Sequence, residues 1–516
     1  MSVRAACLVL PLVCAIACGD ARTGTSAAGG PVLGTDMDSV PVSDSVSESV
    51  TRAVPAPAAA AAPVASTGPL QYLAFGGGSL PGSTEVSLEQ NLLLAREVLG
   101  GPGELLFAGG AGSLSVRELT DDRPRQPSLR VRLGEIFQPR PGRDSRYRRS
   151  TLEVPAATLE AVEASLERAL SEGGDPLLLY VAAHGERGDA PADNYVALWG
   201  GRGLSARALA ALHERAPRPL RAVVTSCFSG GFAELAFRAA DPSKGPAAAP
   251  RCGLFAGLSD RETSGCDPDP DRRRQQGYSL HFLQALAARD RQGEPLAGAD
   301  LDGDGAISLL EAHARARIAS RSIDVPTTTS ERFLRHAVPR VPARAPRLEL
   351  PPVLPEERAV VDALADALEL RTLAETRRRW EGLDRDLAAL DRELAAAERA
   401  SDAAYQSLAA ALLSRWPVLD DAYHPAFERT LADAGPRIEE ALSTWPEVRA
   451  FSQAERRLRV VDARYSGALV EESTVLRLLR ARETLALAAT LQARGGPDLA
   501  HFERLLACER YVPPRP

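Results

Sequence analysis

Lysine is almost absent from this chain of 516 residues, because Lys244 is its single lysine and arginine carries nearly all of the positive charge. Lysine and arginine together number 61, against 68 aspartates and glutamates, so the formal net charge is −7. A protein that binds nucleic acid through its electrostatic field carries an excess of positive charge. The composition therefore gives no reason to expect a nucleic-acid partner.

Long apolar runs are lacking as well. Residues 5–17 are apolar and follow Arg4, but they fall far short of the roughly 20 residues of a spanning helix. They predict a signal peptide over residues 1–17. The small residues before Cys18 resemble a bacterial lipobox, in which Cys18 becomes the lipidated first residue. We therefore expect a lipid anchor in the bacterial cell envelope, on the periplasmic side or the outer surface, with secretion as the alternative.

Cysteine is sparse, with seven in the whole chain. Cys7 and Cys14 leave with the predicted signal peptide. Cys252 and Cys266 flank one loop, and an oxidising compartment permits a disulfide between them. The alternative is that they are two separate small apolar side chains, and the sequence does not decide between these.

Residues 18–68 have almost no aromatic or large aliphatic side chains. Such a composition cannot bury enough apolar surface to offset the entropy of ordering the chain. We expect a lipid-anchored flexible linker that holds a folded domain away from the membrane.

The next 270 or so residues alternate between apolar runs and amphipathic stretches. The apolar runs lie at 70–75, 104–108, 177–183, 223–227 and 254–258. Helical spacing is found at 88–99, 159–170, 206–214, 229–239, 278–288 and 309–319. This alternation predicts an α/β domain over 69–338, in which helices cover a parallel sheet. Residues 111–150 are polar, rich in Arg and Pro and without period, which indicates a long loop or insertion.

Strand signals are absent beyond residue 356. Leucines recur there at three- and four-residue spacing among charged residues, which predicts an all-α domain over 356–510, bundle-like or coiled-coil-like. The Pro-rich run 339–355 is the expected linker. The leucines form either the core of this helical domain or a coiled coil with a protein partner.

Two of the apolar runs end in a reactive side chain. The run 177–183 leads into His184 and Gly185, and the run that begins at 223 ends in Cys227. The carboxyl ends of parallel strands meet at one edge of the sheet, so we predict a cysteine–histidine dyad there. His184 would take the thiol proton, and the start of the helix predicted at 229–239 would stabilise the thiolate. The N–H groups of Gly185 and Cys227 are the candidate oxyanion donors.

Residues 69–335 resemble the caspase-like cysteine peptidases, which include caspases, metacaspases and legumains. The resemblance rests on the apolar strand before His184-Gly185, the apolar strand before Ser226-Cys227, and a spacing that holds one helix. It implies a caspase-like three-layer sandwich with a parallel sheet. It also implies that His184 is the general base and acid, Cys227 the nucleophile, and the N–H of Gly185 an oxyanion donor.

The sequence departs from this family at the position that reads the substrate. Metacaspases carry an aspartate, and legumains a glutamate, two residues before the cysteine, where this chain has Thr225. Asp260 and Glu262, after the next apolar run, are the acids that could take over this role. Thr225, Asp260 and Glu262 are therefore the candidate substrate-binding residues, and the side-chain preference stays open.

Residues 300–311 match the loop of an EF-hand. The match has acids at positions 1, 3 and 5, glycine at 6, an aliphatic residue at 8 and glutamate at 12. The predicted Ca²⁺ ligands are Asp300, Asp302, Asp304, the carbonyl of Ala306, Ser308 and Glu311. The alternative is an acidic turn that caps the following helix. With no obvious partner hand, the site is expected to stabilise the domain.

These observations predict a cysteine endopeptidase that hydrolyses peptide bonds in a protein or peptide substrate. It would be exported, tethered through Cys18 and stabilised by calcium. The alternative is a catalytically silent caspase-like scaffold or peptide-binding lipoprotein.

Overall fold

The computed structural model describes residues 69–120, 127–137, 145–341 and 354–514. The predicted signal peptide, Cys18 and the predicted linker 18–68 lie outside these residues, as does most of the Pro-rich run 339–355. Within the described ranges, no helix combines the length and the apolar character needed to span a membrane.

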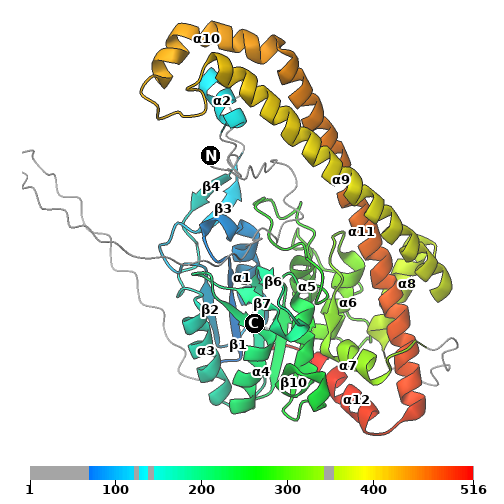
Figure 1. The fold of residues 1–516 in the computed structure, drawn as a ribbon. Helices are drawn as coiled ribbons and strands as arrows, with labels where there is room; N and C mark the ends of the chain where they lie inside the picture. The colour runs from blue at the N-terminus through cyan, green and yellow to red at the C-terminus, as the bar shows by residue number, and fades with distance from the viewer. Residues whose placement is uncertain (1–68, 121–126, 138–144, 342–353, 515–516) are drawn as a thin grey trace, which may run out of the picture. The chain divides into compact units, whose positions relative to one another are not determined.

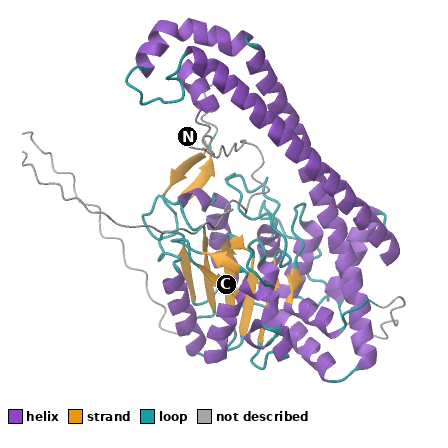
Figure 2. Ribbon diagram, in the orientation of Figure 1, coloured by secondary structure: helices purple, strands orange, loops and turns teal. Residues whose placement is uncertain are grey.

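A six-stranded, mostly parallel sheet forms the centre of the fold (Figure 2). Its order is β11-β10-β9-β5-β1-β2. Five strands are mutually parallel: β1 (Tyr72–Gly77), β2 (Gly103–Phe107), β5 (Leu177–Ala183), β9 (Leu220–Val224) and β10 (Arg251–Phe255). The edge strand β11 (Thr327–Thr328) is antiparallel to β10. The prediction of an α/β fold with a largely parallel sheet is confirmed.

Both faces of this sheet are buried, which explains why its strands read as continuous apolar runs. In β5, Leu177, Leu179 and Val181 belong to one hydrophobic cluster. Leu178 and Tyr180, which alternate with them, belong to the cluster on the other face. Alternate side chains of a strand point to opposite faces, so each face has its own core.

Helices cover the sheet on both sides (Figure 1). One face packs against α3 (Leu159–Ser171) and α4 (Ala206–Arg215). The other face packs against α1 (Val86–Leu99), α5 (Tyr278–Leu286), α6 (Leu309–Ala319) and α7 (Thr329–Ala337). All of these helices except α7, which was not predicted, agree in position with the predicted amphipathic stretches.

The stretch 111–150 holds more structure than the sequence indicated. It forms the antiparallel pair β3 (Val116–Leu119) and β4 (Ser145–Arg148), with α2 (Leu129–Phe137) between them. Leu133 of α2 is buried in a cluster with Leu412 and Phe427, which lie far along the chain. The prediction of an irregular loop was wrong here because α2 finds its apolar partners only in the tertiary structure.

The C-terminal region is helical, as predicted. It comprises α8 (Pro355–Leu368), α9 (Leu373–Arg415), α10 (Phe427–Thr444), α11 (Pro446–Arg494) and α12 (Pro497–Glu509). The long helices α9 and α11 lie side by side and antiparallel (Figure 1). Arg377 pairs with Glu483 near one end, and Ser401 bonds Glu455 farther along. Ala397 of α9 packs against Leu458 and Val461 of α11. At this position the apolar face of α9 therefore contacts another helix of the same chain.

The last helix is joined to the sheet by a disulfide and by shared core. Cys508 of α12 forms a disulfide with Cys252 of β10, and Phe502 lies in the same cluster as Leu254. The pairing of Cys252 with Cys266, which the sequence left open, is therefore not the one formed. The domain boundary predicted at 339–355 stays a prediction, although helices beyond it share core residues with the sheet.

Glu509 is fully buried between α12 and the start of α7. Its carboxylate accepts hydrogen bonds from the Thr329 hydroxyl at 2.6 Å and from the Ser330 N–H at 2.7 Å. Burial raises the pKa of this carboxyl to about 7, although the hydrogen bonds from Ser330 and Thr329 oppose the shift. In the native state Glu509 therefore retains its proton at pH values where the unfolded chain has lost it.

We expect the chain to lose stability as the pH rises from about 5 to about 8, because the native state binds the extra proton in this window. A pKa raised from 4.5 to about 7 corresponds to roughly 3 kcal/mol. The Glu509→Gln variant keeps a neutral side chain at every pH, so its stability advantage over wild type should grow across this window. Thermal melts of both proteins at several pH values measure it, and a constant difference would contradict the assignment.

Candidate active site

His184 and Cys227 follow neighbouring strands of the sheet. β5 and β9 are parallel, with Val181 beside Val224, so the two residues leave the sheet at the same edge. A methyl group added at Gly185 would lie 1.9 Å from the carbonyl oxygen of Cys227. The backbone after His184 is therefore in close contact with the backbone of Cys227. The edge is also where ligands bind in open parallel sheets, next to the point at which the strand order reverses.

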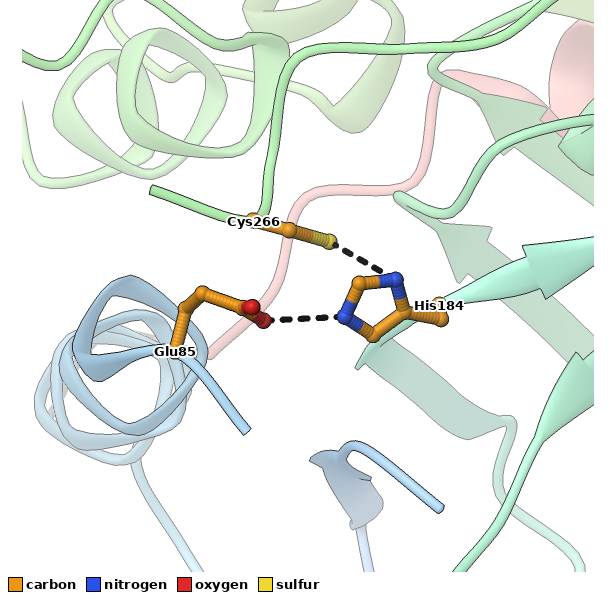
Figure 3. Close-up of side chains that lie close together, drawn as sticks. All are labelled: Glu85, His184 and Cys266. Atoms are coloured by element: carbon orange, nitrogen blue, oxygen red, sulfur yellow. Dashed lines mark hydrogen bonds and ion pairs between the residues drawn. The ribbon is translucent and has the colours of Figure 1, made fainter. Parts of the chain in front are cut away.

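Glu85 was missed by the sequence analysis, yet it contacts His184 directly. It stands at the N-cap of α1, but its carboxylate does not cap the helix. Instead Oε2 lies 2.9 Å from Nε2 of His184, and Oε1 lies 2.7 Å from Arg117 (Figure 3). Burial on its own raises the pKa of the Glu85 carboxyl, but His184 and Arg117 outweigh it and hold the pKa below its ordinary value. Glu85 is therefore a carboxylate.

A carboxylate at Nε2 determines which nitrogen of His184 carries the proton. Glu85 has only acceptors to offer, so Nε2 of a neutral ring must be the donor. Nδ1 is then left with the lone pair and is the nitrogen that can act as a base. In cysteine and serine hydrolases such a carboxylate also holds the ring in place and stabilises the imidazolium formed during reaction.

The thiol that faces Nδ1 in this structure belongs to Cys266. Its Sγ lies 3.5 Å from Nδ1, and Glu85 lies on the other side of the ring (Figure 3). Cys266 is in the irregular segment after β10 and forms no disulfide. Glu85, His184 and Cys266 thus form a cysteine–histidine–glutamate set, with a thiol at one ring nitrogen and a carboxylate at the other.

Cys227 is held beneath the same irregular segment. Its side chain is 2% exposed, and its Sγ lies 3.3 Å from the N–H of Thr263, which points at the sulfur. This hydrogen bond favours the thiolate, whereas the one that Sγ donates to the Thr263 carbonyl, at 3.6 Å, favours the thiol. The next residue, Phe228, has φ 55°, a left-handed conformation that turns the chain sharply from β9 into a short helix.

The helix predicted over 229–239 is present after Cys227 as a shorter 3-10 helix, Ser229–Ala236. Its geometry is tighter and its hydrogen bonds are poorer than those of an α-helix. The stabilisation of a Cys227 thiolate by the start of this helix therefore stays a prediction. Glycines at 230 and 231 pack against the backbone of neighbouring segments. Because they have no side chain, the helix can lie this close to those segments.

The segment that covers Cys227 is held by hydrogen bonds and an ion pair to three other parts of the chain. The carbonyl of Arg261 accepts the N–H of Phe228 at 2.9 Å. The guanidinium of Arg261 binds Glu472 of α11 at 3.0 Å, and Asp324 accepts the N–H of Ser264 at 2.5 Å. The C-terminal helices therefore hold the segment that lies over the predicted nucleophile.

Gly185 retains the geometry expected of an oxyanion donor. The N–H of Ala197 donates to the carbonyl of His184, so these two residues are a hydrogen-bonded pair of the antiparallel ladder. The next pair along the ladder, Gly185 and Val196, therefore exchanges no hydrogen bonds. The N–H of Gly185 therefore points away from β7 (Tyr195–Ala197), out of the edge strand β6 (Gly185–Glu186).

The three candidate substrate-binding residues have different environments. Thr225 is buried, and its hydroxyl donates to the carbonyl of Val181 at 3.0 Å. Asp260 is exposed. Glu262 is half-buried, and burial together with the charge of Glu186 raises its pKa. Thr225 thus bonds the neighbouring strand, whereas Glu186 lies near His184 and Glu262 lies near Glu186.

The calcium-loop candidates are brought together in part. Carboxylate oxygens of Asp300, Asp302 and Asp304 lie within 4.8 Å of one another. Oδ2 of Asp300 accepts the N–H of Gly305, whose φ is 87°. Glu311 uses its carboxylate to bond Ser308 at the start of α6 and the N–H groups of residues 301 and 302. Ala306 lies between them in the turn, with its N–H bonded to Asp304.

Three residues of this site carried no signal in the sequence. Glu85, Cys266 and Asp324 stand in irregular or cap positions, and each acts on a residue far away along the chain. For Cys266 the only hint was its loop position, which the sequence analysis used for a possible disulfide. No protein-family model matches the chain, and no curated protein matches it, so the candidate site rests on the geometry described above.

Proposed function

We propose that this chain is a cysteine endopeptidase of the caspase-like type, with Cys227 as nucleophile, His184 as general base and Glu85 as the residue that positions the base. The observation that carries this proposal is the hydrogen bond of 2.9 Å between Nε2 of His184 and the Glu85 carboxylate. It leaves Nδ1 as the basic nitrogen at the sheet edge where β9 delivers Cys227. The order of His184 strand, intervening helix α4 and Cys227 strand supports the likeness to caspases.

The reaction follows from these positions. Nδ1 of His184 takes the thiol proton of Cys227, and the sulfur attacks the carbonyl carbon of the scissile peptide bond. The N–H groups of Gly185 and Cys227 stabilise the oxyanion of the tetrahedral intermediate. The imidazolium then gives its proton to the leaving amine, and a thioester remains. Water, deprotonated by His184, hydrolyses the thioester and restores the thiol.

This reaction requires a rearrangement of the segment 261–266. Thr263 covers Cys227, and Cys266 occupies the position next to Nδ1. We expect both residues to move before a substrate reaches the buried Cys227 thiol. We therefore propose that this arrangement is a resting form, and that release of the Arg261–Glu472 ion pair opens it.

A peptide-library cleavage assay on the full-length chain tests the proposal. Wild type should cleave a subset of peptides, and the pattern of cleaved sites gives the side-chain preference. Glu186 and Glu262 predict that basic side chains are enriched before the cleaved bond. Equal cleavage by wild type and by Cys227→Ala would remove the basis for a peptidase.

The burial of Cys227 favours one alternative, a catalytically silent scaffold or peptide-binding lipoprotein. A thiol that is 2% exposed does not meet a substrate unless the covering segment moves. The two functions differ in the fate of a bound peptide, which a scaffold returns intact. The same assay, read by binding as well as by cleavage, separates them.

We also propose that residues 300–311 bind Ca²⁺ and stabilise the domain. The clustered oxygens of Asp300, Asp302 and Asp304 suit a hard cation, and Ala306, Ser308 and Glu311 are the remaining candidates. Glu311 would exchange its present hydrogen bonds for the ion. When bound, the ion supplies charge neutralisation to the loop, and the protein residues fix α6 against it.

Calcium should raise the melting temperature of the wild-type chain relative to a chelator. A site with a dissociation constant of about 10⁻⁵ M would stabilise the protein by about 2.7 kcal/mol at 1 mM Ca²⁺. Asp300→Asn should lose most of this gain. Asp290→Asn is the matched control, because Asp290 accepts the same kind of turn hydrogen bonds outside the cluster. Identical melts with calcium and with chelator would contradict the site.

The lipid anchor at Cys18 stays a prediction. It places the peptidase on a membrane surface in the cell envelope, with protein or peptide substrates and no nucleic acid. A partner of the helical region is a further prediction.

A further inference from the structure

Glu85, His184 and Cys266 have a second chemical capacity besides acid–base catalysis. A carboxylate oxygen, one ring nitrogen and the Sγ of these residues all lie within 4.8 Å of one another (Figure 3). The three side chains come from separate parts of the chain, at the start of α1, the end of β5 and the segment after β10. They bring the thiol next to Nδ1 of the imidazole and the carboxylate next to Nε2.

These are the three ligand types of zinc sites. Zinc bonds of about 2.0–2.3 Å at tetrahedral angles put a sulfur and a nitrogen ligand about 3.6 Å apart. The Sγ of Cys266 and Nδ1 of His184 are 3.5 Å apart. For one ion to bind all three, the imidazole and the Glu85 side chain must turn so that the thiol and the carboxylate face the same ring nitrogen, and water would take the fourth position. Burial of His184 and Glu85, whose side chains are 12% and 5% exposed, limits competition from solvent.

We propose that Glu85, His184 and Cys266 bind Zn²⁺, and that bound zinc holds the peptidase in its resting form. Binding releases the thiol proton of Cys266 to solvent and leaves a thiolate on the metal. The zinc also joins the segment 261–266 to the base, so Thr263 stays over Cys227.

Zinc binding removes the general base whichever ring nitrogen it uses. If Nδ1 binds the metal, its lone pair is occupied. If Nε2 binds the metal in place of its proton, the ring proton moves to Nδ1. In both cases His184 cannot take the proton of Cys227. This inhibitory effect rests on the proposed function, whereas metal binding itself does not.

The chemistry of the ligands separates this site from the acidic loop at 300–311. Thiolate and imidazole favour zinc and related soft ions, while carboxylate oxygens alone favour calcium. The site at Glu85, His184 and Cys266 therefore prefers zinc, and the loop 300–311 prefers calcium. A variant of one site is a control for the other.

Zinc binding is measured on the full-length, untagged chain after removal of metals with a chelator, by competition against a chromophoric zinc chelator. Wild type should bind one zinc ion that Asp300→Asn and Cys227→Ala also bind. Cys266→Ser and Glu85→Gln should each bind it at least about tenfold more weakly. The Glu85 variant keeps the test decisive if the Cys266 variant fails to fold.

Three results would overturn the site: no zinc bound by wild type, equal binding by Cys266→Ser and Glu85→Gln, or loss in Cys227→Ala as large as in Cys266→Ser. Inhibition is read separately, as peptide cleavage against zinc concentration. Zinc binding as expected in a chain that cleaves nothing would support the metal site and reject the peptidase. Cleavage that zinc leaves unchanged would reject the inhibitory role.

Discussion

The Cys227→Ala variant should lose peptide cleavage by about 10³-fold or more, because the proposed mechanism forms the thioester on this sulfur. Cys227 sits on the sharp turn after β9, with the backbone of Gly185 against its carbonyl and the N–H of Thr263 on its sulfur. Its surroundings thus offer an oxyanion donor and a group that favours the thiolate. Steady-state cleavage of the best library peptide measures the loss.

Cys266→Ala is the matched control, because it removes the thiol that lies 3.5 Å from Nδ1 of His184. Cys266 takes no part in the proposed reaction, so we expect a far smaller effect than from Cys227→Ala. If Cys266→Ala abolished cleavage and Cys227→Ala did not, the nucleophile would be Cys266, acting through the triad visible in Figure 3.

The Glu85→Gln variant should lower kcat by about 10²-fold or more with little change in KM. The amide keeps the size of the side chain but not the charge that stabilises the imidazolium. The amide can also point its N–H group at Nε2 of His184. Nε2 then has to accept a hydrogen bond, which favours the tautomer with the ring proton on Nδ1. Glu85 does not touch the substrate in this account, so the effect should fall on the chemical step. Initial rates over a range of peptide concentrations separate kcat from KM.

Glu89→Gln is the control for a purely structural effect. Glu89 is equally buried on α1, and it binds Arg148 at 2.6 Å and Ser150 at 2.7 Å, away from His184. It should lower the melting temperature with little effect on kcat. Equal losses of kcat in the two variants would show that Glu85 acts through stability alone.

The sequence was sufficient to predict the sheet and the two strands that end in His184 and Cys227. Both faces of these strands are buried, so each strand appears as an unbroken apolar run followed by a polar residue. Helices α1, α3 and α4 carry the apolar spacing that packs on the sheet. Such patterns can be recognised in a single sequence because the burial of each strand or helix determines the residue types of that segment alone.

The rest of the site depends on contacts between distant residues. Glu85 meets His184 across 99 positions, and Cys266 meets it across 82. A single sequence contains no pattern that links such residues. The disulfide shows the same limit, because Cys252 pairs with Cys508 at a separation of 256 positions, and the nearer Cys266 does not pair with it.

The 3-10 helix after Cys227 has a similar explanation. Its sequence is apolar with glycines at 230 and 231, which is compatible with either helix type. The choice follows from packing, since those glycines lie against the backbone of Ser259 and Pro191. In the same way α2 owes its formation to apolar partners in α9 and α10.

Covalent trapping of the nucleophile tests the central claim most directly. A peptide that carries an electrophilic carbonyl, designed from the library result, is incubated with the full-length chain, and the adduct is located by peptide mapping and mass spectrometry. The account predicts one adduct per chain, on Cys227, and none in Cys227→Ala. An adduct on Cys266, or no adduct on a chain that cleaves the same peptide, would contradict it.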